Sequence, residues 1–211
     1  MSDTNKLYSY GSKDYLERMK ERMDEGTNES LIYAALELRF GVEARLKEYI
    51  ETIEHIPKSQ KNDWQVAKLG RSIESAYRTG DKIMLFTIHF PSDGSEIQLM
   101  YTPVTKRLQD IAKNIGGYLH FTGNGSFDNN SYWQKLRTLL AEAYSLLLLA
   151  TSGELIGLPL IHRPTGKINA RISIESNEIA DSLLKRMKVG EQNVISVTYI
   201  DPMSPITFYQ K

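Results

Sequence analysis

Apolar residues follow a helical period through the first quarter of the chain. From Leu31 to Ile53 they recur every three or four positions, which is the spacing of one face of an α-helix. Such a helix would be roughly 35 Å long, about the width of a small domain. We therefore expect this segment to be the central packing surface. Gly41 lies in its middle, where a small residue suits the close approach of another helix.

Other segments show either the apolar runs of β-strands or the three-to-four-residue spacing of helices. Residues 82–102 contain two apolar runs around the sequence PSDGS, and its Asp93-Gly94 pair predicts the tight turn of a β-hairpin. Pro103 is expected to begin a helix that Gly116 and Gly117 end. Helical spacing predicts four helices besides the central one, at 12–25, 64–78, 103–115 and 131–150.

The last sixty residues change in character after the Thr-Ser-Gly sequence at 151–153. Their pattern predicts short strands at 155–161, 167–174 and 194–200, and one short helix at 177–187. The expected fold class is α+β. A mainly helical body (1–150) surrounds the central helix and includes the hairpin at 82–102, and a small α+β module (151–211) follows.

Composition excludes several classes of protein. Lys plus Arg and Asp plus Glu are equal at 26 each, so no strong basic charge favours non-specific nucleic-acid binding. The chain has no cysteine, which excludes disulfides and thiolate zinc sites. Its longest aliphatic run, Leu146 to Ala150, is far shorter than the ~20 residues of a membrane span. With no apolar signal segment near Met1, we expect a soluble, cytoplasmic protein with no membrane partner.

The sequence shows no motif for a metal or a cofactor. The four histidines are scattered, so a helical His-Glu-x-x-His zinc site is absent. No P-loop occurs, and Gly123 and Gly125 follow no convincing βαβ unit. We therefore expect no metal and no cofactor.

Two groups of residues could form a binding or catalytic site. Arg39 and Glu43 are four positions apart, which fits either an ion pair at the rim of the core or a polar pair kept in a cleft. The segment from Lys106 to His120 combines cations with an aromatic residue. The candidate contacts to a ligand or RNA are Arg39, Glu43, Lys106, Lys113 and Tyr118, and the candidate catalytic pair is His120 with Arg107.

The sequence AALELRFGVEARLKEYI, at residues 34–50, resembles the long core helix of HEPN (higher eukaryotes and prokaryotes nucleotide-binding) families. These families are compact helical bundles, and the resemblance implies an RNA-cutting toxin, a prokaryotic defence component or a non-catalytic partner of one. The ribonuclease motif of the families is an Arg followed four to six residues later by a His. This chain departs from it, because no Arg stands at that distance before any of its histidines.

Three hypotheses follow. The first is a non-enzymatic, prokaryotic-type binding or assembly protein, acting in defence or a toxin–antitoxin pair through a protein partner or self-association. Its 12 tyrosines suit protein interfaces. The second is a metal-independent ribonuclease, with His120 as general acid or base and Arg107 or Arg39 stabilising the phosphorane. The third is a sensor that holds a small anion on Arg39, in a pocket between the helices and the hairpin.

Overall fold

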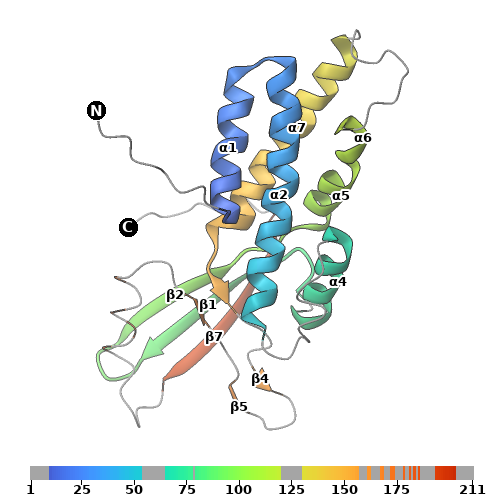
Figure 1. The fold of residues 1–211 in the computed structure, drawn as a ribbon. Coiled ribbons are helices and arrows are strands. Elements are labelled where there is room, and N and C mark those ends of the chain that lie inside the picture. The colour runs from blue at the N-terminus through green and yellow to red at the C-terminus, as the bar shows by residue number, and fades with distance from the viewer. Residues whose placement is uncertain are drawn as a thin grey trace.

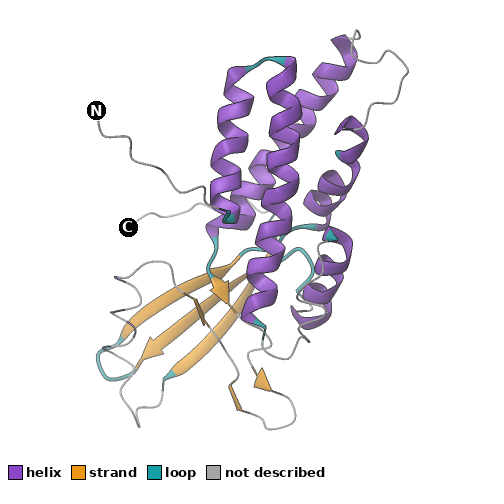
Figure 2. Cartoon of the chain, viewed as in Figure 1, coloured by secondary structure: helices purple, strands orange, loops and turns teal. Residues whose placement is uncertain are grey.

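Most of the helices lie toward one end of the molecule in the computed structural model, and the main sheet lies toward the other (Figure 1, Figure 2). The structure describes residues 10–53, 65–77, 79–119, 130–156 and 193–202, the pairs 161–162, 167–168 and 172–173, and residues 178, 181, 183 and 185. Helices predominate among these residues, and a three-stranded antiparallel sheet accompanies them. The α+β class predicted from the sequence is therefore confirmed.

The first two helices form a hairpin. α1 spans Ser12–Glu25 and ends at Gly26, whose φ of 71° is the left-handed conformation that glycine adopts without steric penalty. α2 spans Asn28–Thr52. The Thr27 side chain caps α2 by accepting a hydrogen bond from the Ser30 N–H, one of the backbone donors that a helix start leaves unpaired.

The predicted apolar face of α2 is buried along its whole length, and α2 packs mainly against α1, followed by α7 (Asn130–Ser152) and α4 (Val66–Tyr77). A Cβ atom placed at Gly41 would lie 2.9 Å from a Leu147 methyl of α7 and 3.2 Å from the Tyr15 Cβ of α1. The expected close approach at this glycine is therefore confirmed. The buried positions of the pattern are Leu31, Ala35, Leu38, Val42, Leu46, Tyr49 and Ile53.

The next helices differ from the prediction at their ends. α4 spans Val66–Tyr77, inside its predicted range. α5 spans Lys106–Asn114 and begins three residues later than predicted, because the Thr105 side chain caps it. Pro103 is thus not its first residue. The two glycines expected to end the helix instead begin a further turn, α6, at Gly116–Leu119.

The main sheet has the strand order β2-β1-β7. β1 (Ile83–Phe90) and β2 (Ser95–Tyr101) form the predicted hairpin, and Gly94 in its turn has a φ of 68°. β7 (Val194–Ile200) pairs with the other side of β1, so the almost wholly apolar β1 becomes the central strand. The main sheet therefore joins the hairpin to a strand about a hundred residues away.

The remaining strands are short two-residue pairs. β3 (Leu155–Ile156) pairs with β6 (Ile172–Ser173), and β4 (Ile161–His162) pairs with β5 (Lys167–Ile168). Most of the helix expected at 177–187 lies outside the described residues. Because β7 completes the sheet of the hairpin, the predicted body and the predicted C-terminal module share backbone hydrogen bonds.

Candidate functional site

Arg39 and Glu43 of α2 form an ion pair at the edge of the helical core. The distance from Arg39 Nε to Glu43 Oε1 is 3.1 Å, and the side chains are 35% and 21% exposed. Of the two interpretations that the sequence allows, the structure favours the ion pair between successive helical turns. A cavity lies between α2, α4 and α5, and neither the Arg39 nor the Glu43 side chain lines it.

The basic residues of α5 have different partners. The Arg107 guanidinium donates two hydrogen bonds, of 2.7 and 2.6 Å, to the Glu142 carboxylate of α7. These bonds lower the pKa of the Glu142 carboxyl. Lys106 pairs along its own helix with Asp110. Arg107 is therefore engaged by a carboxylate, whereas stabilising a phosphorane requires a cation aimed at the reacting group.

The other candidates do not gather at Arg107 either. Tyr118 of α6 packs against Tyr132 of α7, with ring centroids 5.2 Å apart, and its carbonyl accepts a hydrogen bond from the Tyr132 hydroxyl. His120 lies outside the described residues, so its role stays a prediction. Lys106 and Lys113 are the predicted contact residues that line the cavity.

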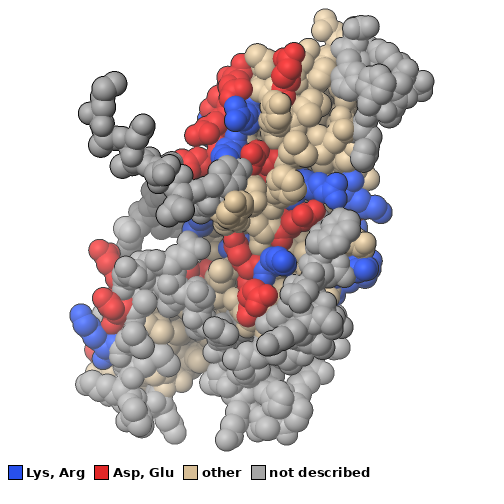
Figure 3. Space-filling view, viewed as in Figure 1, with Lys and Arg blue, Asp and Glu red and all other residues tan. Residues whose placement is uncertain are grey.

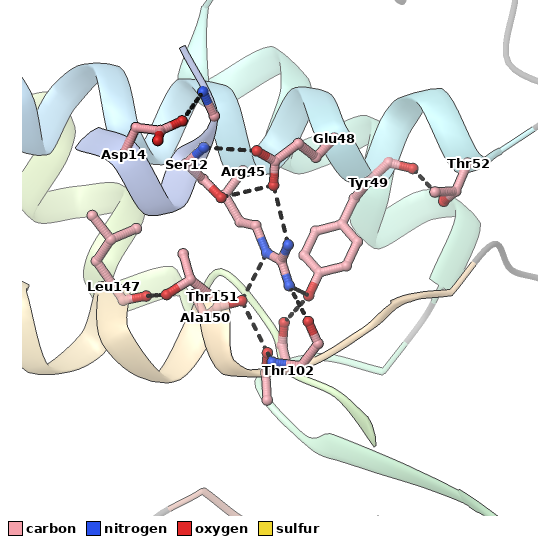
Figure 4. Close-up of polar contacts among 12 residues, drawn as sticks. Ser12, Asp14, Arg45, Glu48, Tyr49, Thr52, Thr102, Leu147, Ala150 and Thr151 are labelled. Atoms are coloured by element: carbon pink, nitrogen blue, oxygen red, sulfur yellow. Dashed lines mark hydrogen bonds and ion pairs between the residues drawn. The ribbon is translucent and has the colours of Figure 1, made fainter. Parts of the chain in front are cut away.

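Arg45 of α2 is fully buried, and sequence reasoning did not single it out. Its Nε donates to the Ala150 carbonyl at 2.8 Å, and its Nη2 donates to the Gly153 carbonyl at 2.6 Å (Figure 4). These carbonyls lie at the end of α7, where backbone acceptors lack partners within the helix. Arg45 therefore caps α7 and places a positive charge at the negative end of its dipole.

Glu48 performs the opposite role at the start of α1. Its carboxylate accepts hydrogen bonds of 2.7 Å from both the Ser12 N–H and the Ser12 hydroxyl, and Arg45 Nη1 donates to it at 3.1 Å. A carboxylate is stabilising at a helix N-terminus because the N–H groups there are unpaired. One ion pair on α2 thus caps two other helices.

Tyr49 extends the same group toward the sheet. Its hydroxyl donates to the Thr102 carbonyl, just after β2, at 2.6 Å, and accepts a hydrogen bond from Arg45 Nη2 at 3.0 Å. Burial raises the pKa of the Tyr49 phenol, so the hydroxyl stays a proton donor at neutral pH. Arg45, Glu48 and Tyr49, which we call the junction cluster, therefore tie α2 to α1, α7 and the end of β2.

The sequence does carry a signal for Arg45. It stands three residues after Val42 and four before Tyr49, so it falls on the apolar stripe of α2. An arginine on a buried stripe needs acceptors for its five N–H groups. Spacing alone cannot identify those acceptors, because the Ala150 carbonyl is 105 positions away.

A cavity of about 580 Å³ lies beside the junction cluster, between α2, α4 and α5. Its buried lining includes Leu46 and Tyr49 of α2 and Tyr101 at the end of β2. The volume falls in the range of roughly 300–1,000 Å³ that is common for small-molecule sites. α4 and α5 each contribute residues at the spacing of one helical face, namely Ala67, Gly70, Arg71 and Glu74 from α4, and Lys106, Gln109, Asp110 and Lys113 from α5.

Gly70 brings these two helices together. A Cβ atom at Gly70 would lie only 2.0 Å from the Gln109 side-chain oxygen. The side-chain Nε2 of Gln109 in turn donates a hydrogen bond to the Val104 carbonyl at 2.8 Å. The absence of a side chain at Gly70 therefore lets α4 pack closely on α5 along one wall of the cavity.

The charged lining of the cavity includes residues with and without partners. Lys106 pairs with Asp110, and its N–H donates to Asp81 at 2.8 Å. Within the described part of the chain, the side chains of Arg71, Lys113 and Glu74 form no ion pair or hydrogen bond. The cavity thus offers two cations and one carboxylate that a ligand could engage.

The wider surface shows both signs of charge. Acidic and basic side chains both occur across the described atoms of the face in Figure 3. Within the described residues, no group of three His, Asp or Glu side chains could hold a metal ion. No helix in that part of the chain is long and apolar enough to cross a membrane.

Comparisons with family models, with curated proteins and with solved structures found no match. The resemblance of α2 to HEPN core helices therefore stays a prediction.

Proposed function

We propose that this protein binds a small molecule with an anionic group and an apolar body, in the cavity between α2, α4 and α5. One observation carries the proposal: the cavity combines a buried lining that includes Leu46, Tyr49 and Tyr101 with two cations, Arg71 and Lys113, whose side chains have no partner in the described residues. Guanidinium groups suit carboxylates and phosphates because they donate two parallel hydrogen bonds.

This proposal combines two hypotheses drawn from the sequence, a binding protein and an anion sensor. It differs from them in the residues that hold the anion. Arg39 is paired with Glu43 away from the cavity, so Arg71 and Lys113 take the role expected of Arg39. The ribonuclease alternative gains no support from Arg107, which is engaged by Glu142. A place in prokaryotic defence or a toxin–antitoxin pair, implied by the HEPN resemblance, stays a prediction.

The test is a thermal-shift screen of aryl and short-chain alkyl carboxylates and phosphates. A ligand at a hundred times its Kd raises the free energy of unfolding by about 2.7 kcal/mol. We expect at least one compound to raise Tm, and the rise to disappear in the Arg71→Gln/Lys113→Gln double variant. The control, Arg107→Gln, removes a cation of α5 that does not line the cavity and should keep the response. No stabilisation by the panel, or the same stabilisation in the double variant, would contradict the proposal.

A second candidate function, assembly with a protein partner or a second copy, is favoured by two exposed aromatic residues of α2. Tyr33 is 56% exposed and Phe40 is 44% exposed, and their spacing of seven places them on one face of the helix. Large exposed apolar side chains on one face are typical of interaction surfaces. Light scattering tests this: Tyr33→Ser/Phe40→Ser is expected to dissociate any oligomer, and a monomeric parent would exclude self-association.

A further inference from the structure

Three polar side chains from adjacent strands form a row on one face of the main sheet. Glu96 of β2 lies directly opposite His89 of β1, with 2.7 Å between the carboxylate Oε1 and His89 Nδ1. On the other side, His89 Nε2 lies 3.1 Å from the Ser196 hydroxyl of β7. The sheet thus places the His89 imidazole between a carboxylate directly opposite it and a hydroxyl diagonal to it on the other neighbouring strand.

The order of these groups is the one that activates a serine. A carboxylate at Nδ1 holds a proton on that nitrogen and leaves Nε2 to accept one. Nε2 faces the Ser196 hydroxyl, so His89 can remove its proton as the oxygen attacks an electrophile. The same three roles, nucleophile, base and orienting carboxylate, occur on unrelated folds and are identified by geometry.

The row is open to substrate. The side chains of His89 and Glu96 are 37% and 50% exposed, and Ser196 is also exposed. It also lies apart from the cavity, because Glu96 is next to the hairpin turn whereas Tyr101, which lines the cavity, is the last residue of β2. The reactivity of this row is therefore independent of the proposed binding function.

We propose that Ser196 is a nucleophile, activated by His89, that accepts acyl groups from activated esters or thioesters. The Ser196 oxygen bonds to the carbonyl carbon while its proton passes to His89 Nε2. The bond from that carbon to the leaving oxygen or sulfur breaks, and the leaving group takes the proton from His89. Water then attacks the acyl-serine with His89 again as base, which releases the carboxylic acid and restores the hydroxyl.

The substrate class follows from the parts present. The described contacts around this row supply a nucleophile and a base but no pair of N–H donors aimed at the carbonyl oxygen. Such donors contribute roughly 100- to 1,000-fold to acyl transfer in serine hydrolases. The site is therefore suited to acyl groups with good leaving groups, such as aryl esters and thioesters, rather than amides.

The experiment exposes the full chain to 4-nitrophenyl acetate and follows nitrophenolate release, with peptide mass spectrometry to locate the acetyl group. We expect acetylation at Ser196, none there in Ser196→Ala, and a rate reduced roughly 100-fold or more in His89→Gln, as expected for loss of a general base. Thr198→Ala is the matched control, since Thr198 is two residues along the same strand and pairs with Leu85, whereas Ser196 pairs with Thr87 and lies diagonal to His89.

Glu96 acts through His89, so it is a positioning residue and needs a separate readout. We expect Glu96→Gln to slow acetylation of Ser196 and Glu96→Asp to restore part of the rate, while all variants keep the parent Tm because the side chains are exposed. Acetylation confined to lysines or tyrosines would overturn the proposal. So would acetylation of Ser196 at the parent rate in His89→Gln.

Discussion

Two arginines of this protein make similar hydrogen bonds in opposite surroundings. Arg45 is fully buried in the junction cluster and donates to a carboxylate, a phenol and two carbonyls at the end of α7. Arg107 on the surface of α5 has a side chain that is 58% exposed, and it donates to one carboxylate, Glu142. The bond lengths are comparable, so distance alone does not distinguish them.

Burial decides what each arginine contributes to stability. Water can replace Glu142 as a partner of Arg107, so the exposed pair adds little. Removing the Arg45 guanidinium takes its donor from the buried Gly153 carbonyl and leaves the Ala150 carbonyl with the Thr102 hydroxyl alone. Buried acceptors without a donor are costly, so removing the donors of Arg45 should reduce stability far more than removing those of Arg107.

The largest effect is expected for Arg45→Met, which keeps a long side chain but removes every donor. We expect the free energy of unfolding to fall by about 3–5 kcal/mol, as is typical when one partner of a buried ionic network is removed. Urea denaturation measures this, with Arg107→Met as the exposed counterpart. Equal, small losses in both variants would show that burial does not separate the two arginines.

The next effect concerns Gly153, whose carbonyl Arg45 binds. A Cβ atom there would lie 2.5 Å from the Met100 carbonyl oxygen and 2.8 Å from the Thr102 nitrogen, both backbone atoms. We expect Gly153→Ala to destabilise the protein by about 1–3 kcal/mol through overpacking. Gly117→Ala is the control, because a Cβ at Gly117 meets nothing within 4 Å. That substitution should be neutral or stabilising, and a similar loss in both would contradict the close packing at Gly153.

A smaller effect is expected for Tyr49→Phe. It leaves the Thr102 carbonyl without its donor and Arg45 without one acceptor. The expected loss is about 1–2 kcal/mol in urea denaturation at neutral pH. Tyr33→Phe, at an exposed position of the same helix, should change the stability little. An equal loss in both variants would mean that the buried hydroxyl makes no special contribution.

Tyr49 also predicts a pH dependence. Its pKa is raised by burial above the ordinary value of 10.0, so the folded state keeps a proton that the unfolded state releases above that pH. The stabilisation is fully present below about pH 10 and declines as pH rises above it, because the folded state then binds more protons. Urea denaturation across this range should show a decline that is shallower in Tyr49→Phe. An unchanged slope would contradict the assignment.

The smallest effect is expected for the exposed pair of Arg107 and Glu142. A double-mutant cycle with Arg107→Gln and Glu142→Gln should give a coupling energy close to the error of measurement, and smaller still at high salt. Because the pKa of Glu142 is lowered, any coupling is present above its ordinary value of 4.5 and lost as pH falls below it. A coupling that survives high salt would show that this pair is less accessible to water than its exposure indicates.

The candidate site was only partly predictable. Lys106 and Lys113 were identified from the basic segment, and both line the cavity. Arg71 was missed because α4 contains no recognisable binding motif around it. Arg39 was identified for its position beside the apolar stripe, but its carboxylate partner is one helical turn away on the same helix.

Local chemistry explains what the sequence by itself determined. The apolar stripe of α2, the Asp93-Gly94 turn and the apolar β1 depend on residues a few positions apart, so their spacing predicts them. Only the tertiary structure decided that β7 pairs with β1, that Arg45 binds the end of α7, and that Ser196 meets His89. These contacts join residues about a hundred positions apart. Their hydrogen-bonding groups could have found many other partners, and the packing of the core selects among them.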